Sequence, residues 1–306
     1  MPAMTSPFGV LAVIADPRTA PELSAVARAL DARGLDHRLL VANGTGPAGL
    51  ATRALDEGHR FLVAVGDDAT VQDVVNGMFR DGRPIREEPV LGVIPAGAGC
   101  DLVRSFGLPS ETDAAVEHLS GDNTYELDLM KVTATVPGGG RVTRYGHNLT
   151  QVGMGAQQHA CATKAPEWLG SAKRFYGFWC GYLKTRPTSV TIAHDTRSWE
   201  GTAWNVVVAN AQFTEGGLRL SPRSFPGDGV LDALVFTGPR SDAYTQLPRL
   251  FRHGDHLPDP SITELKAKLR FEVTTATPFP VLADGVALGT TPATFQVVPR
   301  QVLFKL

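Results

Sequence analysis

The chain has 306 residues, of which 43% are hydrophobic and 20% are charged, and its formal net charge is -2. This composition is typical of a globular protein with a sizeable core, and the length favours two domains because single cores rarely grow past about 250 to 300 residues. The near-neutral charge argues against nucleic-acid binding, which usually requires a basic face. No apolar run approaches the ~18 residues of a membrane helix, so we expect no transmembrane segment.

The N-terminal residues and the cysteines both favour a cytoplasmic protein. Residues 1–7 lack a basic stretch followed by an apolar core, so we expect no secretory signal. Cys100, Cys161 and Cys180 are odd in number and lack Cys-x-x-Cys spacing. We therefore interpret them as reduced thiols rather than as a disulfide framework or a zinc site.

The first 124 residues alternate short apolar runs with amphipathic stretches. Continuous apolar runs are typical of parallel strands buried on both faces, and the stretches between them carry apolar residues at helical spacing. This alternation predicts a doubly wound parallel α/β sheet. The predicted strands are 9–15, 38–42, 61–65 and 90–94, and the predicted helices are 23–30, 50–55, 71–78 and 102–106.

From about residue 125 the pattern becomes mainly antiparallel β. Residues 127–136 and 141–152 flank a Pro-Gly-Gly-Gly turn, which predicts a long hairpin. Residues 167–184 form the one predicted helix of this part. Further strands are predicted at 190–193, 203–209, 229–236, 268–274, 279–282 and 294–298.

Two loops follow predicted strands at the positions where α/β sheets bind ligands. Residues 65–70 are Val-Gly-Asp-Asp-Ala-Thr, and residues 95–101 are Pro-Ala-Gly-Ala-Gly-Cys-Asp. Small residues let backbone N–H groups approach phosphate oxygens, and helix N-termini favour negative charge. The alternative is a pair of ordinary strand-to-helix turns with Asp or Thr N-caps. Neither loop matches Gly-x-Gly-x-x-Gly or the lysine-bearing phosphate loop.

Together these loops resemble those of a known family. Residues 65–77, VGDDATVQDVVNG, resemble the GGDGTxNEVVNG signature of the diacylglycerol kinase catalytic family, which includes bacterial lipid kinases and sphingosine kinases. Residues 93–109, VIPAGAGCDLVRSFGLP, are similar to its IIPLGTGNDFARSLGIP segment, and residues 210–232 are similar to its N…GGG…P…DGLLD segment. Asp284-Gly285 stands where the family has Asp-Gly-Glu. The resemblance covers nearly the whole chain, in the same order.

The resemblance implies an α/β plus β fold like that of NAD kinases and diacylglycerol kinases. Residues 1–124 would form the nucleotide-binding domain, and residues 125–299 would form a mainly antiparallel β-sandwich that holds a lipid. The active site would lie in the cleft between them. The C-terminal strand, at about 300–306, would return to the first domain.

The implied activity is ATP-dependent transfer of the γ-phosphoryl group to a lipid hydroxyl such as that of diacylglycerol, at a membrane surface and with Mg²⁺. Asp68 and Asp284 are the implied catalytic residues. Asp228, with the carbonyls of Phe225 and Val230, would hold a structural Mg²⁺; the alternative is a Gly-Asp-Gly turn without an ion. The implied nucleotide-binding residues are Asp16, Gly66, Asp67, Asp68, Ala69, Thr70, Gly97, Ala98 and Gly99.

Several motif positions depart from the family. Asp67 and Ala69 replace glycines, and Val286 replaces the glutamate regarded as the general base in bacterial members. One like-charge pair at ~5 Å and an effective dielectric of ~20 costs roughly 3 kcal/mol, so Asp67 would weaken ATP binding unless Mg²⁺ lies between them. Asp68 is then the remaining candidate base, or else a helix N-cap. Ala98 and Cys100 replace a hydroxyl and an amide.

These departures leave other functions open. A catalytically impaired relative could act as a lipid-binding or regulatory protein, because fold does not fix function. An NAD-kinase-like enzyme is a third interpretation, although the C-terminal segments match the lipid kinases better. The predicted helix at 167–184 is rich in aromatic and basic residues, so it either contacts lipid tails or an anionic membrane face, or simply packs on a sheet.

Overall fold

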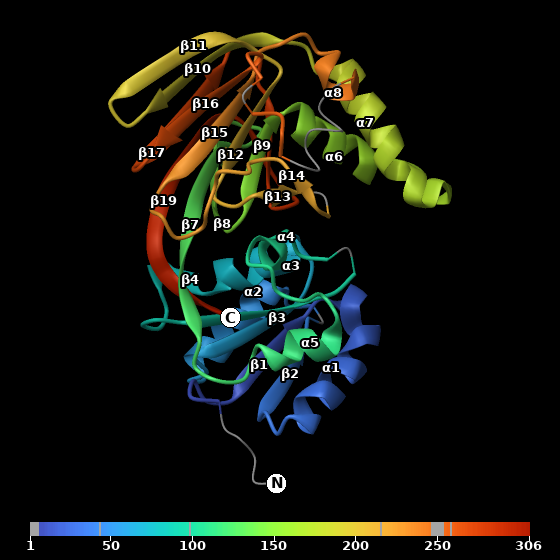
Figure 1. Cartoon of the computed structure of the whole chain (residues 1–306), viewed down its shortest axis with the longest axis vertical. Helices are drawn as coiled ribbons and strands as arrows, with labels where there is room; N and C mark the ends of the chain where they lie inside the picture. The colour runs from blue at the N-terminus through green and yellow to red at the C-terminus, as the bar shows by residue number, and fades with distance from the viewer. Residues whose placement is uncertain (1–5, 43, 98, 215, 246–253, 258) are drawn as a thin grey trace. The chain divides into compact units, whose positions relative to one another are not determined.

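The computed structural model describes residues 6–42, 44–97, 99–214, 216–245, 254–257 and 259–306. The chain divides into two compact units, Met1–Leu129 with Pro299–Leu306, and Met130–Val298 (Figure 1). Among the described residues, no helix combines the length and the apolarity that crossing a membrane requires.

The first unit is built on the predicted parallel sheet. Its strands run in the order β6-β3-β1-β2, and every residue of β1, β3 and β6 is buried, which explains their unbroken apolar runs. The edge strand β2 is partly exposed. The strands are β1 (Leu11–Ala15), β2 (His37–Val41), β3 (Phe61–Gly66) and β6 (Val90–Pro95), with a small antiparallel pair of β4 (Phe79–Arg80) and β5 (Arg83–Pro84).

The connections of this sheet are helical, as the sequence predicts. Leu23, Val26 and Leu30 point into a core that also contains Phe61 and Val63 of β3. The helices are η1 (Pro17–Thr19), α1 (Ala20–Ala32), α2 (Pro47–Asp56), α3 (Asp68–Gly77), α4 (Asp101–Ser105) and α5 (Thr112–Glu117).

The second unit is mainly antiparallel β, and its core holds large buried side chains such as Ile192, Phe271 and Phe295. One run of strands has the order β16-β15-β12-β9-β18-β19, and β10 pairs with both β11 and β17. The strands are β7 (Thr124–Thr135), β8 (Arg141–Gly146), β9 (Leu149–Gly153), β10 (Thr188–His194), β11 (Arg197–Ala203), β12 (Asn205–Ala209), β13 (Phe213–Thr214), β14 (Leu218–Arg219), β15 (Leu231–Phe236), β16 (Ile262–Ala267), β17 (Arg270–Thr275), β18 (Pro280–Ala283) and β19 (Val286–Lys305).

The chain passes from the first unit to the second within β7 and returns within β19. Leu303 near the end of β19 pairs in parallel with Val90 of β6, so the C-terminal strand belongs to the sheet of the first unit. β7 and β8 form the predicted hairpin, from Met130 opposite Gly146 to Thr135 opposite Arg141. The second predicted strand of that hairpin is interrupted, because the chain leaves β8 after Gly146 and β9 pairs with β12 and β18 instead.

The helical part of the second unit differs from the prediction. The single helix expected at 167–184 is a 3-10 helix, η2 (Glu167–Ala172), followed by α7 (Lys173–Lys184). Gly170 breaks the helix because its backbone is left-handed, with φ 47° and ψ -125°. The helix α6 (Met154–Thr163) lacks a marked apolar stripe, which is why its sequence gave no helical signal. A short helix, α8 (Asp242–Thr245), completes the described helices.

The expectation of three reduced thiols is wrong for two of the cysteines. Cys161 of α6 and Cys180 of α7 form a disulfide with 6.0 Å between their Cα atoms. The two residues meet because α6 and α7 lie side by side (Figure 1), a tertiary contact that the spacing of the cysteines does not reveal. Cys100 is a free, buried thiol, as expected.

Candidate functional site

Three loops of the first unit begin at the carboxyl edge of its parallel sheet. Gly66, the last residue of β3, lies opposite Pro95, the last residue of β6, and the Ala96 N–H donates to the Gly66 carbonyl at 3.1 Å. The strand β1 ends beside β3, with Ala15 opposite Val65. The loops after β1, β3 and β6 therefore start next to one another, where parallel sheets bind ligands.

Asp16 starts the loop after β1, and Thr19 ties this loop to the next strand. The Thr19 hydroxyl donates to the Asp16 carbonyl at 2.9 Å and to the Val65 carbonyl at 3.3 Å. Sequence reasoning did not single out Thr19. Its one available signal was its place three residues after Asp16, in the loop that follows the first predicted strand.

Asp67 is the N-cap of α3. Its Oδ1 accepts hydrogen bonds from the Thr70 N–H and the Thr70 hydroxyl, both at 3.0 Å. The Thr70 side chain is buried under this cap, and a Cβ at position 66 would lie 2.5 Å from the Thr70 hydroxyl oxygen. Gly66 is therefore required by the close approach of Thr70, while Ala69 sits half-buried in the first turn of α3.

Asp68 caps a different helix from the one that contains it. Both of its carboxylate oxygens accept from the Asp101 N–H, at 3.1 and 3.0 Å, and Oδ1 also accepts from the Leu102 N–H at 3.4 Å. These donors form the N-terminus of α4, whose partial positive charge favours a carboxylate. Asp68 thus connects the loop after β3 to the loop after β6. The N-cap of its own helix is Asp67, so the N-cap alternative considered for Asp68 holds for α4 rather than for α3.

Cys100 completes this connection. Its thiol donates to Asp68 Oδ1 at 3.2 Å. Burial raises the pKa of the Cys100 thiol well above its usual value, and the negative charge of Asp68 raises it further. The residue is therefore a neutral thiol, which supplies one weak donor where the family has an amide with two.

Gly97 and Gly99 shape the loop after β6. Both have left-handed backbones, with φ 63° and 85°, and among the described residues nothing beyond their own chain neighbours lies within 4 Å of the position that a Cβ would occupy. Their glycine character is therefore explained by backbone conformation and not by crowding within the chain. Open space beside the backbone is what close approach of a phosphate would require. Ala98, also expected at the nucleotide site, lies outside the described residues.

Asp284 belongs to the second unit and forms a tight turn with Gly285. Ala283 pairs with Val286 across this turn, and the two turn residues have φ 45° and 83°, as two-residue hairpin turns require. Because Asp tolerates the left-handed conformation and Gly adopts it freely, Asp-Gly suits the position.

The Asp284 carboxylate is buried and holds the segment between β8 and β9. It accepts from the backbone N–H groups of His147 (2.7 Å), Asn148 (3.2 Å) and Leu149 (2.9 Å). His147 Nδ1 lies 3.1 Å from Asp284 Oδ2, and both side chains are fully buried. The Asn210 amide donates to the His147 carbonyl at 2.9 Å. Sequence reasoning missed His147, which falls inside the strand predicted at 141–152 and has no separate signal in the sequence.

Val286, at the position of the family's glutamate, is an apolar contact. It is half-buried and packs against the hydrophobic core of the second unit. The Val286 side chain therefore contributes packing and has no atom that could accept a proton.

The proposed Mg²⁺ ligands lie in one turn. Asp228 is exposed and its Oδ1 accepts from the Val230 N–H at 3.0 Å, while the Phe225 carbonyl accepts from the Gly227 N–H at 2.9 Å. Ser224, whose hydroxyl donates to the buried Asp232 at 2.7 Å, anchors the turn. One carboxylate and two carbonyls are hard oxygen donors of the kind that Mg²⁺ prefers, so the donor set fits the ion chemically.

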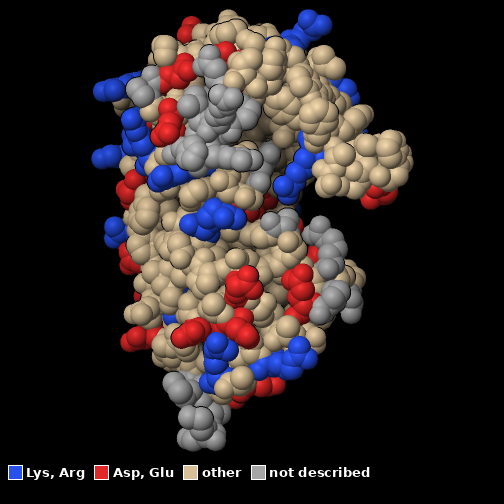
Figure 2. Space-filling model, turned by 45° about the vertical axis from the view of Figure 1, so that its right-hand side comes forward, with Lys and Arg blue, Asp and Glu red and all other residues tan. Residues whose placement is uncertain are grey.

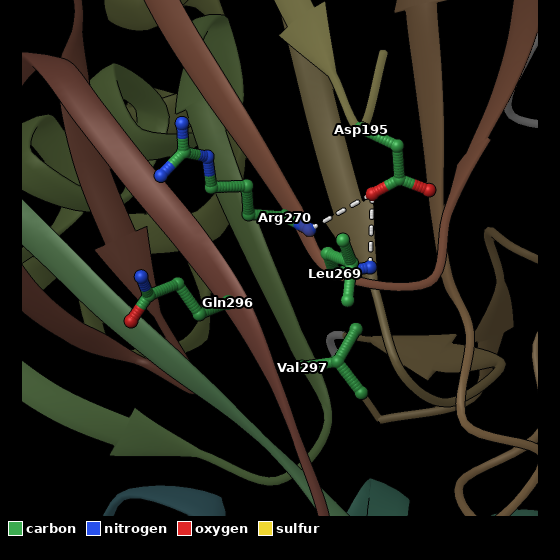
Figure 3. Close-up of a pocket in the computed structure, with 5 residues that line it drawn as sticks. All are labelled: Asp195, Leu269, Arg270, Gln296 and Val297. Carbon is green, nitrogen blue, oxygen red and sulfur yellow. Dashed lines mark hydrogen bonds between the residues drawn. The ribbon is translucent and has the colours of Figure 1, made fainter.

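Two surface hollows lie away from all these residues. One, of about 390 Å³, is in the second unit and is lined by Asp195, Leu269, Arg270, Gln296 and Val297 (Figure 3). Its only carboxylate already accepts three backbone N–H groups, which lower the pKa of Asp195. The other, of about 370 Å³, lies between α1 and the start of α5. Neither hollow contains a predicted site residue.

Comparisons with known proteins identify two domains in this chain. The diacylglycerol kinase catalytic domain matches residues 15–132, and the YegS C-terminal NAD kinase beta sandwich-like domain matches residues 150–304. The chain is 26% identical over 265 residues to a diacylglycerol kinase of Bacillus subtilis, covering 83% of this chain and 82% of the relative. It is 27% identical over 203 residues to a probable lipid kinase YegS of Salmonella arizonae, covering 62% of each.

Solved structures show the same fold. A putative diacylglycerol kinase from Bacillus anthracis superposes with a TM-score of 0.76 at 18% identity, covering 98% of both chains. An NAD kinase from Archaeoglobus fulgidus, solved in complex with ATP, superposes with a TM-score of 0.51 at 13% identity, covering 97% of this chain and 93% of the other. The two domain matches together span most of the sequence, and the chain therefore belongs to the lipid kinase family marked by the diacylglycerol kinase catalytic domain together with the YegS C-terminal NAD kinase beta sandwich-like domain.

Proposed function

We propose that this protein is an ATP-dependent lipid kinase that transfers a γ-phosphoryl group to a lipid hydroxyl such as that of diacylglycerol. One observation carries the proposal: Asp68 joins the loop after β3 to the N-terminus of α4, so two small-residue loops present their backbone at one edge of the sheet. Phosphoryl transfer depends mainly on positioning and charge neutralisation, which such loops and a helix N-terminus supply.

In this proposal each unit has its own role. Gly97 and Gly99 bring backbone N–H groups to the phosphates, and Asp68 serves as the candidate general base. Asp284 acts in the lipid-binding unit, where its hydrogen bonds fix His147 and Asn148. When bound, Mg²⁺ supplies charge neutralisation. Asp228 with the Phe225 and Val230 carbonyls is the proposed site of a structural ion. The remaining proposed nucleotide contacts are Asp16, Gly66, Asp67, Ala69, Thr70 and Ala98.

A second candidate function rests on Val286. Because this side chain packs against the core where relatives have a glutamate, the base used by bacterial members is absent at this position. Loss of a general base costs about 10² to 10⁴ in rate. A catalytically impaired lipid-binding or regulatory protein on the same fold would keep the lipid-holding unit intact.

Calorimetric titration of the full chain with a non-hydrolysable ATP analogue, with and without Mg²⁺, separates the two candidates. The kinase proposal expects binding that Mg²⁺ strengthens, together with phosphate transfer to diacylglycerol. Absence of nucleotide binding under both conditions would reject the kinase and favour the impaired relative. Binding without transfer to any of several lipid hydroxyls would also favour the impaired relative.

We also propose a cytoplasmic protein that binds membranes peripherally. The Cys161–Cys180 disulfide is unusual for a reducing compartment, where most thiols remain reduced. Intact-mass measurement on protein trapped rapidly from cells would show which form exists there.

A further inference from the structure

Among the described residues, nothing covers an apolar stripe along one side of the helix α7. Phe175 and Leu183 are each 69% exposed, and Trp179, which lies between them, is 37% exposed. These residues are spaced by four, so they lie along one face of the helix. Trp168 in the preceding η2 is 83% exposed. We call Trp168, Phe175, Trp179 and Leu183 the aromatic face.

The opposite side of α7 is fixed against α6, so the exposure is built into the fold. A Cβ at Gly177 would lie 2.8 Å from the Gln158 carbonyl oxygen, and one at Gly181 would lie 2.8 Å from the Gln158 backbone. The two helices can therefore pack this closely only with glycine at both positions. The Cys161–Cys180 disulfide crosses the same contact. Rotation of α7 to bury its aromatic face would break both features.

Aromatic contacts hold the aromatic face in place on its remaining side. Trp179 packs against Tyr244 of α8, with 5.6 Å between ring centroids, and Tyr182 packs against the same ring at 5.3 Å. Tyr182 and Phe178 also contact the core beneath the helix. The exposed rings are therefore supported from below, as expected for a rigid surface rather than a loose segment.

Basic side chains surround the aromatic face. Residues 154–186 contain five Lys or Arg residues and one Glu, a net charge of +4 in a chain whose formal net charge is -2. Figure 2 shows this region as a projecting, mostly uncharged lobe with Lys and Arg side chains next to it. Lys173 is paired with Glu167 at 2.6 Å. The exposed cations are Lys164, Arg174, Lys184 and Arg186.

We propose that the α6–α7 hairpin, residues 154–184, docks the protein on a bilayer that contains anionic lipid, with the aromatic face in the interface. Exposed Trp, Phe and Leu side chains flanked by Lys and Arg match the apolar and anionic layers of such a surface. A second copy of this chain is a poorer occupant, because its identical patch would bring like charges together. The choice of a membrane rests on the proposed function, since a lipid kinase must reach a substrate held in a bilayer.

The first test uses the unmodified full chain and no nucleotide. It should sediment with vesicles of phosphatidylcholine and phosphatidylglycerol, but much less with phosphatidylcholine alone, and added salt should release it. Fluorescence emission of the tryptophans should shift to shorter wavelength on binding, because Trp168 and Trp179 leave water. Failure to bind the anionic vesicles would overturn the proposal without any variant.

Variants then assign the surface. The double change Phe175→Ser and Leu183→Ser should weaken vesicle binding at least about tenfold, because two exposed apolar side chains no longer enter the interface. The double change Arg174→Gln and Lys184→Gln should weaken it about 25-fold, at roughly fivefold per cation. Leu269→Ser and Lys268→Gln are the matched controls, since Leu269 is also 69% exposed but lies near the hollow of Figure 3.

Equal losses of vesicle binding in the hairpin and control variants would reject the assignment to α7. Unchanged vesicle binding by hairpin variants that have the circular dichroism spectrum of the wild type would also reject it. Conversion of a dimer to a monomer by the Phe175 and Leu183 changes, without vesicle binding in the wild type, would show that a second copy is the occupant. Phosphorylation of a short-chain diacylglycerol in detergent micelles should be unchanged in the hairpin variants. Vesicle binding without any such phosphorylation would leave this proposal standing and reject the kinase.

Discussion

A single carboxylate determines how the two loops of the first unit meet. Asp68 lies in α3, but its oxygens accept N–H groups from Asp101 and Leu102 at the start of α4. The side chain of its neighbour Asp67 accepts, among the described residues, from Thr70 of its own helix. Adjacent residues of the same type therefore have separate tasks, one local and one that joins two segments distant in sequence.

The change Asp68→Asn tests this division. The amide keeps the shape but replaces one acceptor by a donor that faces N–H groups, so we expect about 1 to 3 kcal/mol lower stability in urea unfolding. We also expect loss of lipid phosphorylation. Asp67→Asn is the matched control, because Asn caps helices as well as Asp does and stability should change little. Wild-type turnover in the Asp68→Asn variant would remove Asp68 from the mechanism, and equal stability losses in both variants would contradict the bridging role.

His118, in the first unit, should make the stability of the protein depend on pH. Burial lowers the pKa of His118 from 6.5 to about 4, and the positive charge of Lys305 adds to this effect. Neither ring nitrogen of His118 has a hydrogen-bond partner among the described residues. The folded protein therefore keeps this ring neutral over a range of pH in which the unfolded chain takes up a proton.

Stability should consequently fall as the pH decreases from 6.5 to about 4, by roughly 2 to 3 kcal/mol from His118. His118→Leu should reduce this slope, as measured by urea unfolding at several pH values. Some slope should remain, because burial also lowers the pKa of His159. His59→Leu is the control, since the His59 ring is half-buried and lies 3.1 Å from the Val10 carbonyl. Identical slopes in wild type and His118→Leu would refute the assignment.

At the scale of elements, the disulfide joins α6 to α7 between two cysteines that are 19 residues apart in sequence, and so closes a loop. Closing a loop of about this size stabilises a protein by roughly 3 kcal/mol in the chain-entropy description. We expect Cys180→Ser to lower the free energy of unfolding by about 2 to 3 kcal/mol, and a reducing agent to have the same effect on the wild type but none on the variant. Cys100 is a free, buried thiol in both proteins, so it contributes equally to the two measurements.

Alkylation followed by intact-mass measurement provides the independent check. Before reduction the denatured protein should accept one alkyl group, on Cys100, and after reduction it should accept three. Three groups without reduction would show that Cys161 and Cys180 are a dithiol. In that case Cys161 and Cys180 would lie close together because Gly177 and Gly181 let α7 pack tightly on α6.

The sequence predicted elements well where a local signal existed. The buried strands β1, β3 and β6 have continuous apolar runs, and the Asp284-Gly285 turn has the residues that its left-handed backbone requires. Features that depend on tertiary packing could not be predicted from the sequence. The disulfide depends on the approach of α6 to α7, and the exposure of α7 depends on which of its two faces carries glycine.

At the scale of the whole molecule, motif order predicted the family and the fold, because the segments that resemble it lie along nearly the entire chain. The details of the candidate site were less accessible. Asp68 can reach α4 only because β3 and β6 are in a register that puts Gly66 opposite Pro95. The packing role of Val286 likewise depends on the core of the second unit and is not visible in the motif.

The site of this protein differs from the family's motifs at positions 67, 69 and 286. The triple change Asp67→Gly, Ala69→Gly and Val286→Glu restores the family's residues. The glycines remove one charge near the expected phosphates and allow closer backbone approach. The glutamate restores a proton acceptor. If these changes are sufficient, ATP affinity and lipid phosphorylation should rise together, in calorimetry and in a phosphate-transfer assay.

The structure also predicts what these changes cost. Replacing the Asp67 cap by Gly should cost only a few tenths of a kcal/mol, and Ala69→Gly in the first turn of α3 up to about 1 kcal/mol. Val286→Glu should cost more, because its side chain now packs against the core. The double variant Asp67→Gly with Ala69→Gly is the control: it should improve nucleotide affinity without restoring the rate of phosphate transfer.

A folded triple variant with unchanged ATP binding and no activity would show that the departures extend further. Cys100, which provides a weak thiol donor in place of an amide, would then be the next position to change, and a lipid-binding role would become the better account of the protein.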